Sequence, residues 1–187
     1  MRKFWGALGL LLLAAVPSFG QTPKFELSAG PTFDRYTDHN GIDLDLAGWT
    51  FSGEYNVFRW LGGEFQASGA YNNHEVVGFT SLYTAQVGPV FYPLRHHKIT
   101  PWGHFLIGEG YYHDDIPANG GYPATQKGDF AKAWRVGAGL DFNLKSHWGI
   151  RMIQFDYGPT RFFGNKVSQP DYRLSIGVTY RIGTKKK

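Results

Sequence analysis

The feature that most constrains the fold of this chain is a strict alternation of apolar and polar residues along several long segments. From Trp134 to Leu144 every second side chain is apolar, and the positions between them carry Arg135, Asp141, an asparagine and two glycines. Because successive side chains of a β-strand point to opposite faces of a sheet, a period of two predicts strands. Glycines inside such segments are costly in a helix, so an all-β fold is favoured.

Eight segments carry this pattern. The strongest lie at 46–57, 61–72, 133–144 and 172–182, and the weaker ones lie at 24–33, 81–92, 100–112 and 148–157. In the last of these the phase breaks at Met152-Ile153, where one inserted residue, a β-bulge, restores a common polar face. Each segment is about 9–12 residues long, which is the length that a tilted strand needs to cross a bilayer.

The connections between these segments alternate in length. Short turns are expected around Arg59, at 95–98 and at 145–147, whereas most other connections are longer and polar, and the longest runs from His113 to Ala131. Short turns at one end and long loops at the other are typical of outer-membrane barrels. The sequence therefore predicts an eight-stranded antiparallel transmembrane up-and-down β-barrel with both chain ends on the short-turn side.

The polar face of these strands is predicted to line the barrel interior. It is rich in glycine and serine, not in the lysine, glutamate and threonine that cover the solvated face of a soluble sheet. An eight-stranded barrel is just wide enough inside for side chains to fill it. The charged residues expected to face inward are Lys24, Glu26, Glu54, Glu64, Arg135, Asp141, Arg151, Asp156, Arg173 and Arg181.

These interior charges are expected to form ion pairs, because a buried charge without a partner is expensive. On the opposite face, apolar residues such as Val136 and Ile176 are expected to point at lipid, with aromatic residues near the strand ends forming two interfacial girdles. The predicted pairs join Glu54, Glu64 and Asp141 with Arg135, Arg173 and Arg181, and bring Glu26 near Arg173 or Arg181 where the first strand meets the last.

The N-terminal residues have the order of an export signal. A positively charged start and an apolar run precede the small residues Ser18 and Gly20, and Gln21 follows. This order predicts a signal peptide over residues 1–20 and one mature domain over 21–187. The apolar run is shorter than the ~20 residues of a transmembrane helix.

Together, the signal peptide, the eight segments and the closing stretch 172–183 resemble the OmpA/OmpX-like superfamily of small outer-membrane β-barrels. The last strand carries Ser175-x-Gly177-x-x-Tyr180-x-Ile182, which is similar to the insertion signal that the barrel-assembly machinery reads in such strands. The resemblance implies a monomer in the outer membrane of a Gram-negative cell envelope. The implied partners are membrane lipids, lipopolysaccharide and, during insertion, the assembly machinery.

A structural or surface-contact role follows by elimination, with a closed polar lumen and long extracellular loops. His104 near Glu109 offers a base, but no nucleophile stands beside it, so an enzyme is not expected. No catalytic, cofactor or metal site is predicted, because no standard ligand spacing occurs.

Three alternatives to this role stay open. They are a soluble periplasmic lipocalin-like ligand carrier, a narrow pore and a lipid-modifying barrel enzyme. Nucleic acid is not an expected partner, because the charge of +4 falls to +2 once Arg2 and Lys3 are removed with the signal.

Overall fold

The computed structural model describes residues 23–37, 41, 43–74, 78–95, 97–116, 125–145, 147–164 and 168–183. The predicted signal peptide and the cleavage site before Gln21 lie outside these residues, so both stay predictions. No helix in the described part of the chain is long and apolar enough to cross a membrane.

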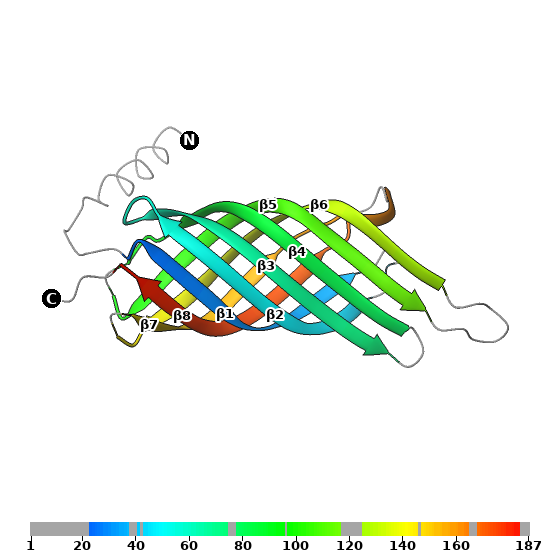
Figure 1. Cartoon of the computed structure of the whole chain (residues 1–187), viewed down its shortest axis with the longest axis horizontal. Helices are drawn as coiled ribbons and strands as arrows, with labels where there is room; N and C mark the ends of the chain where they lie inside the picture. Colours follow the sequence, from blue (N-terminus) through cyan, green and yellow to red (C-terminus); the bar gives the residue numbers. More distant parts are fainter. Residues whose placement is uncertain are drawn as a thin grey trace, which may run out of the picture.

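Eight antiparallel strands form a closed barrel, each paired with its neighbours in chain order (Figure 1). The last strand returns to pair with the first, so the predicted eight-stranded up-and-down barrel is confirmed. The strands are β1 (Phe25–Thr37), β2 (Asp43–Asn56), β3 (Leu61–His74), β4 (Gly78–Phe91), β5 (Ile99–Ile116), β6 (Thr125–Asn143), β7 (Trp148–Tyr157) and β8 (Asp171–Ile182).

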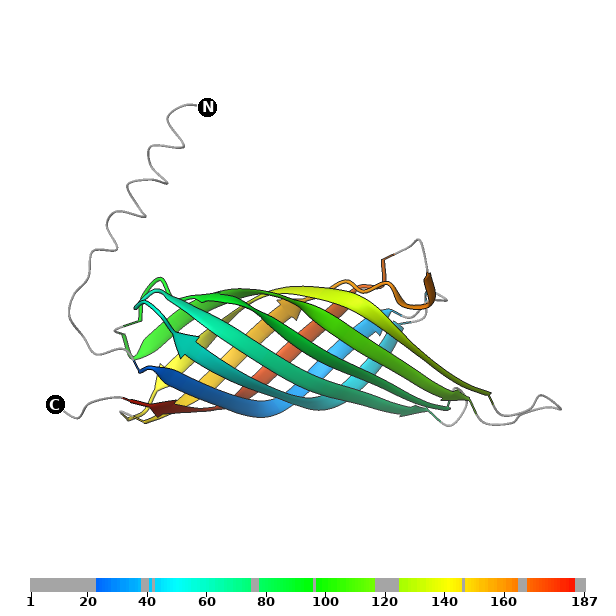
Figure 2. The ribbon, with the colours of Figure 1, turned by 45° about the horizontal axis from the view of Figure 1, so that its top comes forward.

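The predicted contrast between short turns and long loops holds only in part, because the connection 75–77 between β3 and β4 is shorter than the connection 92–98 between β4 and β5 at the opposite end. We call the end that holds Lys24 and Gly183 the turn end and the opposite end the loop end. Beyond the loop end the β5–β6 hairpin projects farther than the barrel wall beside it (Figure 2). The structure pairs β5 and β6 as far as Ile116 and Thr125.

The prediction of a loop from His113 to Ala131 is therefore wrong over most of its length. The two strands are 18 and 19 residues long, well beyond the predicted segments 100–112 and 133–144. The alternation of apolar and polar residues stops partway along the hairpin, where its outward face is no longer apolar. Backbone pairing between the two strands continues beyond that point. The alternation of apolar and polar residues therefore predicts the part of a strand that has one apolar environment and one polar one, and not the full length of the strand.

The outward face of the barrel is apolar over about 9–11 positions on each strand, the length of a membrane-crossing strand. The outward residues run from Phe25 to Phe33 on β1, for example, before the charged and exposed Arg35. On β5 and β6 the band ends at Glu109 and Lys132, which are exposed and directly opposite each other.

Exposed aromatic side chains gather near both ends of this band, as expected for interfacial girdles. At the turn end they are Phe25, Tyr55, Phe58, Trp60, Phe91, Trp148 and Tyr180, and at the loop end they are Phe33, Trp49, Phe79, Tyr83, Trp134 and Tyr172.

The predicted bulge in β7 is present. The pairing of β7 with both neighbours shifts register between Arg151 and Gln154, opposite Asp141 on β6 and Gly177 on β8. The extra residue leaves Met152 and Ile153 both exposed on the outward face, while Arg151 and Gln154 both point inward. One inserted residue thus keeps the polar side of β7 in the interior along its whole length.

Glycines allow the barrel to close at the seam between β1 and β8. A Cβ atom on Gly177 would lie 2.6 Å from the carbonyl oxygen of Ala29, and one on Gly30 would lie 1.8 Å from that of Ile176. Gly177 belongs to the proposed insertion signal. The close approach of the two backbones is a separate reason for glycine at this position.

Candidate functional site: the barrel interior

The interior holds the charged residues that the sequence points to. Glu26, Glu54, Glu64, Arg135, Asp141, Arg151, Asp156, Arg173 and Arg181 are each at most 8% exposed. Lys24 is the exception, because its side chain is exposed and not inside. It precedes the first residue of β1, at the rim where its ammonium group reaches solvent.

At the turn end, Glu26 joins two cations. Its carboxylate accepts a hydrogen bond from Nε of Arg181 at 2.9 Å, where β1 meets β8, and a second from Arg95 in the β4–β5 turn. The Asn56 side-chain amide also donates to Glu26, at 3.0 Å. Arg95 reaches this cluster from outside the strands, so no alternation in the sequence marks it.

The next layer is organised by Arg151 on β7. Its guanidinium group reaches Glu54 on β2 and Asp141 on β6, each at 3.1 Å. It also lies over the ring of Trp102, 4.1 Å from the ring centroid, and the Trp102 indole N–H donates to Asp141 at 2.9 Å. The Tyr92 hydroxyl donates to Glu54. One arginine therefore holds two buried carboxylates, which tolerate burial only with such partners.

His104 lies at mid-barrel between two carboxylates. Its Nδ1 is 2.7 Å from Glu64 on β3, and its Nε2 is 3.0 Å from Asp156 on β7. Each ring nitrogen therefore has a carboxyl group within hydrogen-bond distance, and the imidazole links β5 to β3 and β7. Gly137 makes room for the pair, because a Cβ atom there would lie 1.9 Å from Oδ1 of Asp156.

Toward the loop end, two further arginines are paired. Arg173 donates from Nε to both carboxylate oxygens of Asp34, at 2.8 and 2.9 Å, and from Nη1 to Ser68 at 2.7 Å. Arg135 donates to Asp171 at 2.7 Å and to Gln66 at 3.3 Å.

Most of the predicted pairings are different in the structure. Asp141 pairs with Arg151 and not with Arg135, which lies six positions away on the same strand. At about 3.3 Å per residue along a strand, the two backbones are too far apart for a direct ion pair. Glu54 likewise pairs with Arg151, and Glu64 with His104.

Four members of these ion pairs escaped the sequence reasoning. Asp34 and Asp171 lie one residue beyond the predicted segments 24–33 and 172–182, in phase with the inward positions, so longer segments would have included them. His104 is also in phase, although the sequence links it to Glu109, which lies on the outward face. Arg95, the fourth, had no periodic signal.

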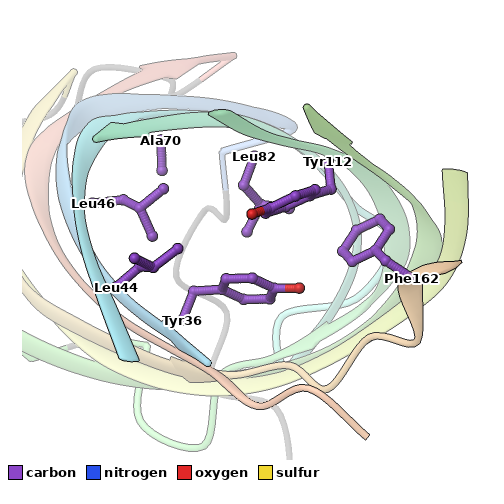
Figure 3. Packing of buried hydrophobic residues seen from close by; sticks show 7 residues of the cluster. All are labelled: Tyr36, Leu44, Leu46, Ala70, Leu82, Tyr112 and Phe162. Atoms are coloured by element: carbon purple, nitrogen blue, oxygen red, sulfur yellow. The ribbon is translucent and has the colours of Figure 1, made fainter. Parts of the chain in front are cut away.

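At the loop end the interior becomes apolar (Figure 3). Phe162, in the loop between β7 and β8, is fully buried, with its ring 6.4 Å from Tyr36 and 5.6 Å from Tyr112. Gln169 anchors it, because its Oε1 accepts the Phe162 N–H at 2.9 Å and the Tyr36 hydroxyl at 3.1 Å. We call this group the apolar plug, made of Tyr36, Leu44, Leu46, Ala70, Leu82, Tyr112 and Phe162.

A polar interior along the whole barrel was expected, and the apolar plug corrects that expectation. Inward-facing leucines on β2 and β4 pack with the two tyrosines above the last ion pairs, so the interior is apolar at this level. Within the described residues, no group of histidine and acidic side chains is suited to a metal ion.

Comparisons with known proteins agree with this architecture. A family model described as outer membrane protein beta-barrel domain matches residues 6–181. No curated protein sequence matches the chain.

Solved structures share the fold at low sequence identity. Neisserial surface protein A is 12% identical with a TM-score of 0.70, and the match covers 85% of this chain and 97% of that one. The attachment invasion locus protein Ail of Yersinia pestis, in complex with the heparin analogue sucrose octasulfate, is 19% identical with a TM-score of 0.62, and the match covers 87% of this chain and 100% of that one. The outer membrane protein OprG of Pseudomonas aeruginosa is 13% identical with a TM-score of 0.57, and the match covers 87% of this chain and 97% of that one.

Proposed function

This chain belongs to the outer membrane protein beta-barrel domain family and resides in the bacterial outer membrane, and from this premise we propose a structural and surface-contact role with a closed interior. The soluble periplasmic carrier considered from the sequence is wrong, because the family is one of outer-membrane proteins. The short turns and chain ends then face the periplasm, and the long β5–β6 hairpin faces outward.

The observation that carries the closed interior is the stack of filled layers along the barrel axis. Ion pairs around Arg151, His104 and Arg173 occupy successive levels, and each of these side chains is at most 3% exposed. The apolar plug lies above them, toward the loop end. An aqueous pore needs a wider barrel, since open channels belong to barrels of ~16 strands.

Purified protein in planar bilayers is therefore expected to give no steady single-channel currents, because side chains fill the successive layers described above. A general porin of ~16 strands, inserted under the same conditions, serves as the positive control. Large, steady currents from the wild-type chain would show that the interior is a pore and would contradict the proposal.

We also propose that the protein is not an enzyme, since the described interior residues offer no catalytic arrangement. Both ring nitrogens of His104 are occupied by Glu64 and Asp156, so the imidazole has no free nitrogen to act as a base. All three side chains are fully buried in the interior, away from the lipids outside the barrel.

Surface contact is proposed for the part of the β5–β6 hairpin that rises beyond Glu109 and Lys132. Phe130 is 70% exposed there and packs on Tyr111 with 4.5 Å between ring centroids. Phenylalanine and tyrosine are both enriched in protein interfaces relative to the rest of the protein surface. The names of two proteins with this fold, a surface protein and an attachment protein, point in the same direction.

The barrel wall itself is proposed to contact only lipid and lipopolysaccharide. All eight strands are paired in a closed ring within the apolar band, so no sheet edge is left there for a second copy. This favours a monomer.

Cells that display the Phe130→Ser variant are expected to bind a panel of immobilised extracellular matrix proteins on the order of tenfold more weakly than wild type. Asp45→Ser, at an exposed position of β2 toward the loop end and outside the hairpin, is the control and should leave binding unchanged. Equal binding by wild type, both variants and cells without the protein would argue against a contact role for the hairpin. Heat-modifiability on a gel shows that each variant is folded.

A further inference from the structure

A small polar pocket opens at the turn end, apart from the filled layers above it. It has a volume of about 180 Å³, well above the ~10–15 Å³ that one water molecule needs. Its lining comes from the strand ends and turns around the mouth of the barrel, namely Pro23, Glu26, Tyr92, Arg95, Thr100, Asn143, Lys145 and Arg181.

The charges that line this pocket do not balance. Arg95, Arg181 and Lys145 bring three positive groups to it, and Glu26 is the one acidic residue in the lining. In the layer above, Asp141 is already held by Arg151. The mouth of the barrel therefore keeps an excess of positive charge, which favours an anion.

Donors in the pocket are also free. Arg181 uses Nε for Glu26, while its two terminal nitrogens have no hydrogen-bond partner among the described residues. The Lys145 side chain is exposed at the rim and makes no ion pair within those ranges. A guanidinium group with two open nitrogens matches two oxygens of a phosphate or carboxylate group.

The two arginines are held close together by the single carboxylate of Glu26. Burial and the neighbouring charge of Arg181 lower the pKa of Arg95 to about 9, so both groups stay charged at neutral pH and repel each other. A further anion in the pocket would relieve that repulsion.

We propose that this pocket binds a phosphate-type oxyanion from the periplasmic side, held by the terminal nitrogens of Arg181 and by Lys145. The ligand chemistry is the phosphate group, which a soluble phosphate or a phospholipid headgroup supplies. The site is independent of the surface-contact role, because it lies at the opposite end of the barrel and shares no residue with the part of the β5–β6 hairpin beyond Glu109 and Lys132.

Inorganic phosphate is the probe, titrated calorimetrically into the full mature protein in a phosphate-free sugar detergent at constant ionic strength. Saturable binding is expected for wild type. Lys145→Gln should weaken it several-fold, and Lys145→Glu should remove it, because the charge at the rim is reversed. Lys98→Gln, an exposed lysine of the neighbouring turn that does not line the pocket, is the matched control and should bind as wild type does.

Two further arms complete the test. Arg181→Gln should weaken binding by about tenfold, the loss expected for a hydrogen bond to a charged group. If Arg181→Gln does not fold, the two Lys145 variants still test the proposal. Phosphate binding that is weaker in phospholipid nanodiscs than in the phosphate-free detergent assigns the site to lipid headgroups, and equal binding assigns it to a soluble ion. No saturable binding by wild type, or an equal loss in Lys98→Gln and Lys145→Gln, overturns the proposal.

Discussion

Replacing Ile176 with arginine is expected to prevent the barrel from folding into lipid vesicles. Ile176 lies near the middle of the apolar band on β8, and its side chain is 55% exposed on the outward face. An arginine at the bilayer midplane costs about 2–4 kcal/mol in a β-barrel. Urea titration of folding into vesicles, read by heat-modifiability, measures the loss.

The preceding residue provides the matched control. Ser175 is 2% exposed and points inward, and its hydroxyl has no hydrogen-bond partner within the described residues. Ser175→Ala therefore breaks no contact and should fold as wild type does. If Ile176→Arg folded normally while Ser175→Ala did not, the assignment of the two faces would be inverted.

Arg151→Met is expected to cause the largest loss of stability among single substitutions inside the barrel. It removes the one cation that Glu54 and Asp141 share and leaves two buried carboxylates facing each other in the same layer. Breaking a buried ion pair in this way costs about 3–5 kcal/mol. The measurement is the free energy of unfolding from urea titrations in vesicles.

A double-mutant cycle tests the observed pairing against the predicted one. Asp141→Asn and Arg151→Met should be less destabilising together than the sum of the two single effects, by about 0.5–3 kcal/mol, because the two groups are in contact. Asp141→Asn with Arg135→Met is the control cycle and should be additive, since these residues contact different partners. Coupling in the control cycle and additivity in the first would contradict the pairing in the structure.

Much of the fold could be predicted because its main signal is local. Alternation in 133–144 and 172–182 follows directly from the opposite environments of the two faces of a strand. The phase break at Met152-Ile153 located the bulge for the same reason. The positions of the strand ends could not be predicted as well, because the β5–β6 hairpin continues beyond the apolar band and its sequence no longer alternates there.

The sequence by itself determined which side chains face inward, because that depends only on their phase along each strand. It could not determine which of them meet. The contact of Arg151 on β7 with Glu54 on β2, and of His104 with both Glu64 and Asp156, joins strands that are not neighbours in the ring. Such contacts depend on how the closed sheet is staggered and tilted, which is a property of all eight strands together. The tertiary structure alone also placed Phe162 in the barrel mouth, because an apolar residue in a loop gives no periodic signal of where it will be buried.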